Sequence, residues 1–222
     1  TIISPDGDNN FPGNVVAKTT YTLTEDNKID IAYEATTDKT TVINMTNHSY
    51  FNLSGDPSTT ILDHICYLNA DNITPIDATC MTSGEYAPVA GTAFDFLAPH
   101  AIGDRINETS DEQIANGNGY DHNWVLNTKG DDTQLCASVK SPVTGIILKV
   151  YTNEPGIQFY TGNFLDGSVT GKKGIVYNQR AGLCLESQKY PDSPNKQWPE
   201  SNPYLNAGEK YYSHCIFAFS AE

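Results

Sequence analysis

Basic residues are scarce in this chain of 222 residues: 13 lysines and arginines stand against 27 aspartates and glutamates, giving a formal net charge of −14. Nucleic-acid binding depends on clustered lysine and arginine that neutralise phosphates, so the composition argues against a nucleic-acid partner. The same deficit disfavours binding to an anionic membrane surface. The charge instead predicts solubility, and it is compatible with a small neutral ligand.

The sequence also lacks any apolar run long enough to span a bilayer, and no segment has the pattern of a signal or transit peptide. Because Thr1 is compatible with a processed terminus, secretion stays open. Asn-x-Ser/Thr sequons would suit a secreted protein, although three of the five share one Asn/Ser/Thr-rich segment where such triplets arise easily. The sequons are at Asn44, Asn47, Asn52, Asn72 and Asn107.

The number and spacing of the cysteines argue against secretion. The five cysteines contain no Cys-x-x-Cys pair and no Cys/His spacing typical of zinc, so the sequence predicts neither a metal site nor a cofactor. An odd number leaves at least one thiol free in a monomer. Buried, reduced cysteines in a reducing compartment are the simplest interpretation, and we expect the cytoplasm. The cysteines are Cys66, Cys80, Cys136, Cys184 and Cys215.

No sustained helical period is present, and a Thr-rich and Asn-rich background with 13 tyrosines favours strands and turns. Ile29, Ile31 and Tyr33 alternate with polar residues, which is typical of a half-buried strand. Residues 1–14 have the composition of a loop, 86–96 of an extended segment, 99–106 of a short helix and 107–118 of irregular chain. The predicted strands span residues 15–23, 28–36, 41–46, 61–70, 124–126, 135–139, 145–151, 157–161, 182–187 and 211–219.

Strand after strand, joined by turns, indicates an all-β protein built as an antiparallel β-sandwich. Hydrophobic residues make up 38% of the chain, which is enough to form a packed core. No repeat or low-complexity linker divides the sequence, so residues 1–222 are predicted to form one domain.

Glu186 is the strongest candidate for chemistry. It ends the apolar stretch of residues 182–186, beyond which the chain turns polar and proline-punctuated. Partial desolvation would raise the pKa of such a carboxyl and make it a better base near neutral pH. The structural alternative is a salt bridge from Glu186 to Arg180 or Lys189.

His48 and Asp121 are the next candidates. His48 lies in a dense polar and aromatic context, residues 44–53, and an imidazole can donate or accept a proton near neutrality. Asp121 lies close to Trp124, and a carboxylate beside an indole is a common sugar-binding pair. Asp121 is equally compatible with capping a turn after Gly119.

Three further polar residues are predicted to line the same cavity. Gln158 and Tyr160 alternate along one strand and therefore share a face, and Asn47 adjoins His48. Packing in the protein interior is the structural alternative for Gln158 and Tyr160. A serine hydrolase is disfavoured because no Gly-x-Ser-x-Gly motif is present, while Asp121 and Glu186 leave a glycosidase open. Phosphate-binding and dinucleotide-binding glycine motifs are absent.

With these segments assembled, the chain resembles the aldose 1-epimerase, or galactose mutarotase, family. The similarity runs through residues 44–53, 119–126, 156–163 and 182–195, with supporting matches at 4–7, 11–13 and 94–96. It implies a β-supersandwich fold and interconversion of the α and β anomers of galactose, glucose and related aldoses, without cofactor or metal. By position, Glu186 would be the base, His48 the acid, and Asp121 a ligand of the sugar hydroxyls.

One departure from the family pattern is large. The resemblance implies additional sequence upstream, which supplies early strands of the sandwich plus an arginine and a second histidine that face the sugar. Residues 1–14 hold no counterpart, so the chain corresponds to the C-terminal two-thirds of such a domain. The alternatives are a fragment, one product of a cleaved precursor and a truncated relative. An upstream polypeptide would supply the missing strands in the first two cases, and without it unpaired sheet edges would favour aggregation. The alternative function is a catalytically weak carbohydrate-binding or regulatory module.

Overall fold

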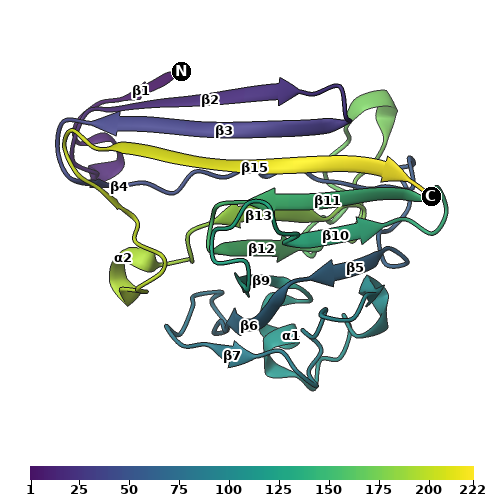
Figure 1. Cartoon of the computed structure of the whole chain (residues 1–222). Helices are drawn as coiled ribbons and strands as arrows, with labels where there is room; N and C mark the ends of the chain where they lie inside the picture. Colours follow the sequence, from purple (N-terminus) through teal and green to yellow (C-terminus); the bar gives the residue numbers. More distant parts are fainter.

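The computed structural model describes all residues from Thr1 to Glu222, and antiparallel strands dominate it. The larger sheet has eight strands in the order β1-β2-β3-β15-β11-β10-β5-β8 (Figure 1). Its members are β1 (Ile2–Ser4), β2 (Val15–Leu23), β3 (Lys28–Thr37), β5 (Ile65–Leu68), β8 (His100–Ala101), β10 (Ala137–Lys140), β11 (Ile146–Thr152) and β15 (Lys210–Ala221).

The second sheet has five strands in the order β13-β12-β9-β6-β7, and a short pair, β14 with β4, stands apart. The five strands are β6 (Ala70–Thr74), β7 (Ala87–Pro88), β9 (Asp121–Leu126), β12 (Gly156–Tyr160) and β13 (Cys184–Gln188). The short pair joins β4 (Thr41–Val42) to β14 (Tyr204–Leu205). The small sheet matters for function, because β13, β12 and β9 carry most of the predicted site residues.

The two sheets share one hydrophobic core. A single cluster of 33 buried residues takes Leu148 and Phe217 from the large sheet and Trp124 and Phe159 from the small one. The ring of Phe51, from the chain between the sheets, packs edge-on against Phe217 with centroids 5.0 Å apart. These contacts confirm the predicted antiparallel β-sandwich.

The predicted hairpin of residues 15–36 is confirmed as β2 and β3, which pair residue by residue from Val15–Thr37 to Leu23–Ile29. The buried residues of β3 alternate as its sequence predicted, with Ile31 in the core. In contrast, β2 lies largely in solvent: Leu23 is 81% exposed. Figure 1 shows β1, β2 and β3 forming the upper edge of the molecule, beside which no further strand lies.

The predicted helix at residues 99–106 is wrong. Residues His100 and Ala101 instead form β8, which pairs with β5, and Ile102–Asp104 make a single 3-10 turn. The helix in this region, α1 (Glu112–Gly117), begins within the segment predicted to be irregular. Asp111 caps it by accepting hydrogen bonds from the backbone of the first turn. A six-residue helix with few apolar positions shows no periodicity that a sequence reading could detect.

Several strand limits also differ from prediction. The expected strand at 41–46 stops after Val42, the one at 61–70 divides into β5 and β6 in different sheets, and 86–96 contains only the two-residue β7. Residues 1–14, predicted as loop, contain β1 and the 3-10 turn Asp8–Asn10. A second short helix, α2 (Ser193–Lys196), and the 3-10 turn Lys172–Gly174 complete the elements. Short strands depend on a partner for their hydrogen bonds, so their limits follow from tertiary pairing.

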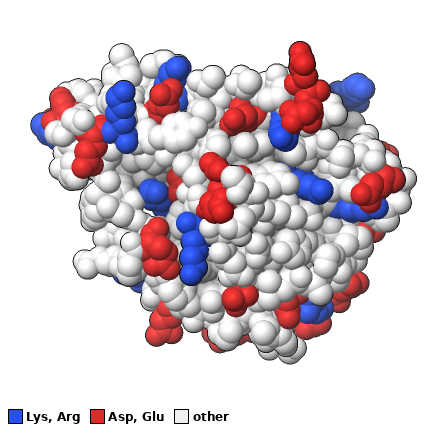
Figure 2. Space-filling view, viewed as in Figure 1, with Lys and Arg blue, Asp and Glu red and all other residues white.

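None of the helices has the length and apolar character needed to cross a bilayer. On the face shown in Figure 2, acidic and basic side chains are interspersed, and the lysines and arginines are scattered singly or in small groups. The excess of acidic residues is therefore dispersed over this face.

Candidate active site

One face of the small sheet carries the site. In the antiparallel register, Gln158 on β12, which lies between β13 and β9, is opposite Glu186 of β13 and Asn123 of β9. The next row along brings Tyr160 between Cys184 and Asp121. Since paired residues point to the same side of a sheet, polar side chains from three strands converge there. The opposite face holds core residues such as Trp124 and Phe159.

His48 reaches this face from the irregular segment that follows β4. Its Nε2 atom lies 3.6 Å from Oε1 of Glu186. The two residues are 138 positions apart, so local sequence does not reveal that they are neighbours. The imidazole ring also contacts two tyrosines, with centroid distances of 5.2 Å to Tyr50 and 6.2 Å to Tyr160. The two predicted catalytic residues thus face a common space, and the histidine side chain is 52% exposed.

Burial sets the acidity of Glu186. Only 8% of the residue is exposed, and desolvation raises the pKa of its carboxyl to about 7; the charge of His48 opposes this shift and that of Asp121 adds to it. The alternative salt bridges are wrong: Lys189 pairs with Glu154 at 3.1 Å, and Arg180 donates to Thr161, Asn163 and the backbone of Asn118. Glu186 therefore has the acidity of a base that works near neutral pH.

Asp121 is held in place by an amide. Gln158 Nε2 donates to Asp121 Oδ1 at 2.9 Å, and burial raises the pKa of this carboxyl while the hydrogen bond from Gln158 and the charge of His48 oppose the shift. The predicted pairing with an indole is wrong. Trp124 points into the core from the other face of β9, where its Nε1 donates to the carbonyl of Phe94. Their odd separation of three residues along a strand puts them on opposite faces.

Gln188 extends this amide network and was not predicted. Its Nε2 atom lies 3.0 Å from Oε1 of Gln158 and 3.2 Å from Oδ1 of Asn123, so it fixes the orientation of the amide that holds Asp121. The sequence carried a signal for it: Cys184, Glu186 and Gln188 alternate along one strand and share one face.

Two predicted binding residues differ in their surroundings. Tyr160 faces the site, where its ring packs edge-on against Tyr50 at 6.1 Å and its hydroxyl accepts from the backbone of Phe164. Asn47 adjoins His48 in sequence, but its side chain donates to the hydroxyl of Tyr21 on β2 and accepts from the backbone of Ser49. Asn47 thus ties the His48 segment to the large sheet.

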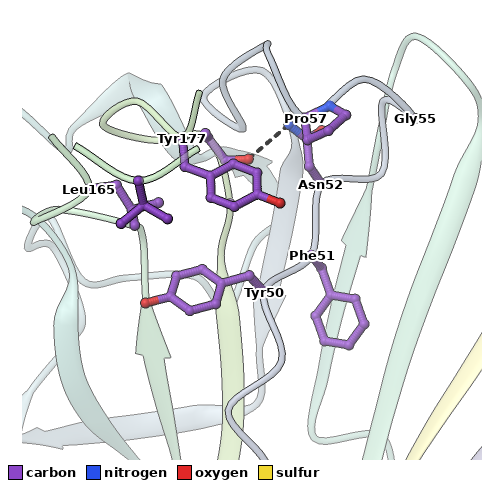
Figure 3. A pocket seen from close by; sticks show the side chains of 10 residues that line it. Tyr50, Phe51, Asn52, Gly55, Pro57, Leu165 and Tyr177 are labelled. Atoms are coloured by element: carbon purple, nitrogen blue, oxygen red, sulfur yellow. Dashed lines mark hydrogen bonds between the residues drawn. The ribbon is translucent and has the colours of Figure 1, made fainter. Parts of the chain in front are cut away.

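A mostly apolar cavity of about 610 Å³ adjoins the site (Figure 3). Tyr50 is the shared wall: one side of the residue faces the cavity, and its ring neighbours His48 and Tyr160. Figure 3 shows Tyr177 and Leu165 across the cavity from Tyr50. The cavity lining contains neither Glu186, His48 nor Asp121, so it lies beside the polar face described above.

A buried carboxylate with a pKa near 7 and an imidazole within 4 Å can exchange protons with two oxygens bonded to one carbon, which is the arrangement of a cyclic hemiacetal. The fold and this site together define a β-sandwich protein that brings a carboxyl of raised pKa and an imidazole to one polar face of its small sheet. The sequence model of the family "Aldose 1-epimerase" matches residues 1–218, and the chain belongs to that family.

Curated relatives agree with the family model. The chain is 44% identical over 219 residues to galactose mutarotase of Mus musculus, covering 98% of this chain and 61% of that protein. It is 42% identical over 221 residues to aldose 1-epimerase of Escherichia coli strain K12, covering 99% of this chain and 62% of the relative. The chain therefore spans about three fifths of the length of these relatives.

Solved structures show the same fold. A GalM/aldose epimerase homologue from C. elegans superposes with a TM-score of 0.87 at 28% identity, covering 99% of this chain and 64% of the other. Galactose 1-epimerase from Lactobacillus acidophilus gives a TM-score of 0.84 at 33% identity, covering 99% and 61%. These similarities confirm the galactose mutarotase-like class expected from the sequence.

Proposed function

We propose that this chain provides the catalytic base and acid of an aldose 1-epimerase that interconverts the α and β anomers of galactose, glucose and related aldoses. The observation that carries the proposal is the 3.6 Å approach of His48 Nε2 to Glu186 Oε1 on the polar face of the small sheet. The names of the relatives, galactose mutarotase and aldose 1-epimerase, support the substrate class.

The reaction begins with the anomeric hydroxyl beside Glu186 and the ring oxygen beside His48. Glu186 takes the proton of the hydroxyl, a carbonyl forms at C1, the bond from C1 to the ring oxygen breaks, and protonated His48 gives its proton to that oxygen. After rotation about the C1–C2 bond the roles reverse, and the ring closes on the other face of the carbonyl. Positioned acid–base groups of this kind contribute about 10²–10⁴-fold each.

The remaining polar groups hold the sugar. Asp121 uses Oδ1 to accept from Gln158, and its Oδ2 is available for a sugar hydroxyl. Gln158 Nε2 keeps a second hydrogen for the ligand, and Tyr160 offers a ring edge beside His48. Asn47 acts from the rim through the segment that carries His48. No cofactor is needed for these proton transfers.

Polarimetry on freshly dissolved α-D-galactose tests the proposal. The chain should speed the decay of optical rotation above the buffer rate, and Glu186→Gln should remove at least about 100-fold of that acceleration, because the amide cannot accept the proton. Sugar binding by the variant, followed by calorimetry, should persist. Retained turnover in Glu186→Gln would contradict the assignment of the base. Release of phenol from an aryl galactoside would indicate a glycosidase instead.

A second candidate is a carbohydrate-binding or regulatory module with weak catalysis. Such a module would keep the polar face that holds the sugar, through Asp121 and Gln158, without accelerating the reaction. Binding of galactose together with a relaxation rate equal to that of buffer would select this function. Both measurements use the same chain, so one experiment separates the two candidates.

We propose further that residues 1–222 act as one domain in the cytoplasm and pack against an upstream polypeptide. The single core cluster supports one domain, the five free thiols support a reducing compartment, and the exposed strand β2 supports a partner segment. Intact-mass analysis of the natural protein tests the compartment and the upstream polypeptide, since it reports added sequence, disulfides and sequon glycans together, and a single cooperative transition in urea unfolding tests the single domain. Glycosylation at the five sequons would contradict the cytoplasmic assignment.

A further inference from the structure

Three side chains of different chemistry converge at the acid–base pair. A ligand atom from each of His48, Cys184 and Glu186 lies within 4.8 Å of the other two. Cys184 and Glu186 are alternate residues of β13 and therefore face the same side, while His48 approaches from the opposing loop. Imidazole nitrogen, thiolate and carboxylate oxygen are the three ligand types that zinc takes in proteins.

The spacing suits a tetrahedral ion. Zinc bonds of about 2.0–2.3 Å place neighbouring ligand atoms roughly 3.3–3.6 Å apart at tetrahedral angles. The separation of His48 Nε2 from Glu186 Oε1, 3.6 Å, already falls at this value. The widest separation in the trio is at most 4.8 Å, and the half-exposed His48 has room to move toward the other two ligands.

Local charge also favours a cation. Asp121 lies close enough for its charge to raise the pKa of both Glu186 and Cys184, and the lysine and arginine nearest in sequence are engaged with other groups. Burial raises the pKa of the Cys184 thiol above its ordinary value, so the free thiol keeps its proton. A bound metal would displace that proton to solvent, because coordination stabilises the thiolate.

We propose that Zn²⁺, or a divalent ion of similar softness, binds across His48, Cys184 and Glu186 and silences the acid–base pair. The metal occupies the imidazole lone pair and the carboxylate oxygen that the reaction needs, and the thiol proton leaves to solvent without any redox change. Three protein ligands leave a fourth position for water or a sugar oxygen. The proposed binding of the metal depends only on the geometry of the three ligands, whereas its effect on the rate of mutarotation rests on the proposed function.

Cobalt absorption tests the binding directly. Co²⁺ substitutes for zinc and absorbs in the near ultraviolet when a thiolate coordinates it. The chain with Cys80→Ser, which removes the exposed thiol far from the ligand trio in sequence, should show this absorption at one equivalent of Co²⁺ and lose it when excess Zn²⁺ is added. Absence of thiolate absorption in that folded protein would overturn the proposal.

Inhibition tests the functional part. Zn²⁺ should abolish catalysed mutarotation in the unmodified chain and in Cys80→Ser, and a chelator should restore it. Cys184→Ser should need at least about tenfold more Zn²⁺ for half inhibition, relative to its own metal-free rate, because a hydroxyl is a poor zinc ligand. Equal sensitivity of Cys184→Ser and Cys80→Ser would refute the role of Cys184. A chain that binds Co²⁺ through thiolate but never catalyses mutarotation would refute the proposed function and leave the metal site standing.

Discussion

Replacing Glu186 with glutamine should stabilise the protein at alkaline pH while it removes activity. The carboxyl is almost buried, and its pKa is raised from 4.5 to about 7 in the folded chain. Because the folded-state pKa exceeds the unfolded one, ionisation opposes folding. The favourable contribution of the protonated form is complete below pH 4.5 and is lost as pH rises through about 7. Glutamine keeps the neutral form at every pH.

The expected gain in the free energy of unfolding follows from the pKa shift of Glu186. The difference between 4.5 and about 7 corresponds to at most roughly 3–4 kcal/mol. Screening by solvent reduces it to about 1–2 kcal/mol, and the opposing charge of His48 is already contained in the pKa of about 7. For a chain of this size, such a gain raises the unfolding midpoint by about 2–8 °C at pH 8. At pH 4.5 the same substitution should change the midpoint little, since both side chains are then mainly neutral.

Calorimetry of the unmodified chain and Glu186→Gln at both pH values is the assay. Glu25→Gln is the matched control, because Glu25 is an exposed carboxyl in the turn between β2 and β3. The control should leave the midpoint nearly unchanged at both pH values. A Glu186→Gln variant that is equally stabilised at pH 4.5 and pH 8, or destabilised at pH 8, would refute the reasoning that burial of the charge sets this pKa.

Three further predictions concern activity and packing. The kcat/KM of mutarotation should fall as pH drops through about 7, because Glu186 becomes protonated. Asp121→Asn should move this fall to lower pH, because the charge of Asp121 raises the pKa of Glu186. A pH–rate profile in which the fall stays at the same pH would contradict this. Gln188→Ala should lower kcat/KM roughly three- to tenfold, since one neutral hydrogen bond contributes about 0.5–1.5 kcal/mol and here orients Gln158; unaltered kinetics would exclude a positioning role. Phe217→Ala should destabilise the fold by about 3–5 kcal/mol in urea unfolding, because its ring fills the core between the sheets; a smaller loss would mean that the core collapses around the vacancy.

Much of the sandwich was accessible from sequence pattern. Alternation in residues 28–36 gave β3, and the hairpin to β2 followed from the polar turn between them. Short elements were not predicted because their sequences contain no periodic pattern of apolar residues. Helix α1 holds one buried apolar side chain, Ile114, beside a buried glycine, and β8 has only two residues. Hydrogen bonding to β5 makes β8 a strand, and that partner lies far away in sequence.

The same division applies to the site. Alternation along β12 correctly predicted that Gln158 and Tyr160 share a face, and Asp121 joins them through the register of β9. The proposed sugar contact of Trp124 failed because sequence proximity hides the direction of a side chain until the strand limits are known.

The sequence by itself determined the class of fold, the family and the identity of the two groups proposed to transfer protons, because motif and alternation are local properties of the chain. Tertiary structure decided the distance between Glu186 and His48, the burial that brings the pKa of Glu186 to about 7, and the approach of Cys184 to both. These quantities arise from the packing of β13 against a loop that is remote in sequence. Acidity and metal affinity depend on such neighbours and on the exclusion of water, and only the folded chain brings them together.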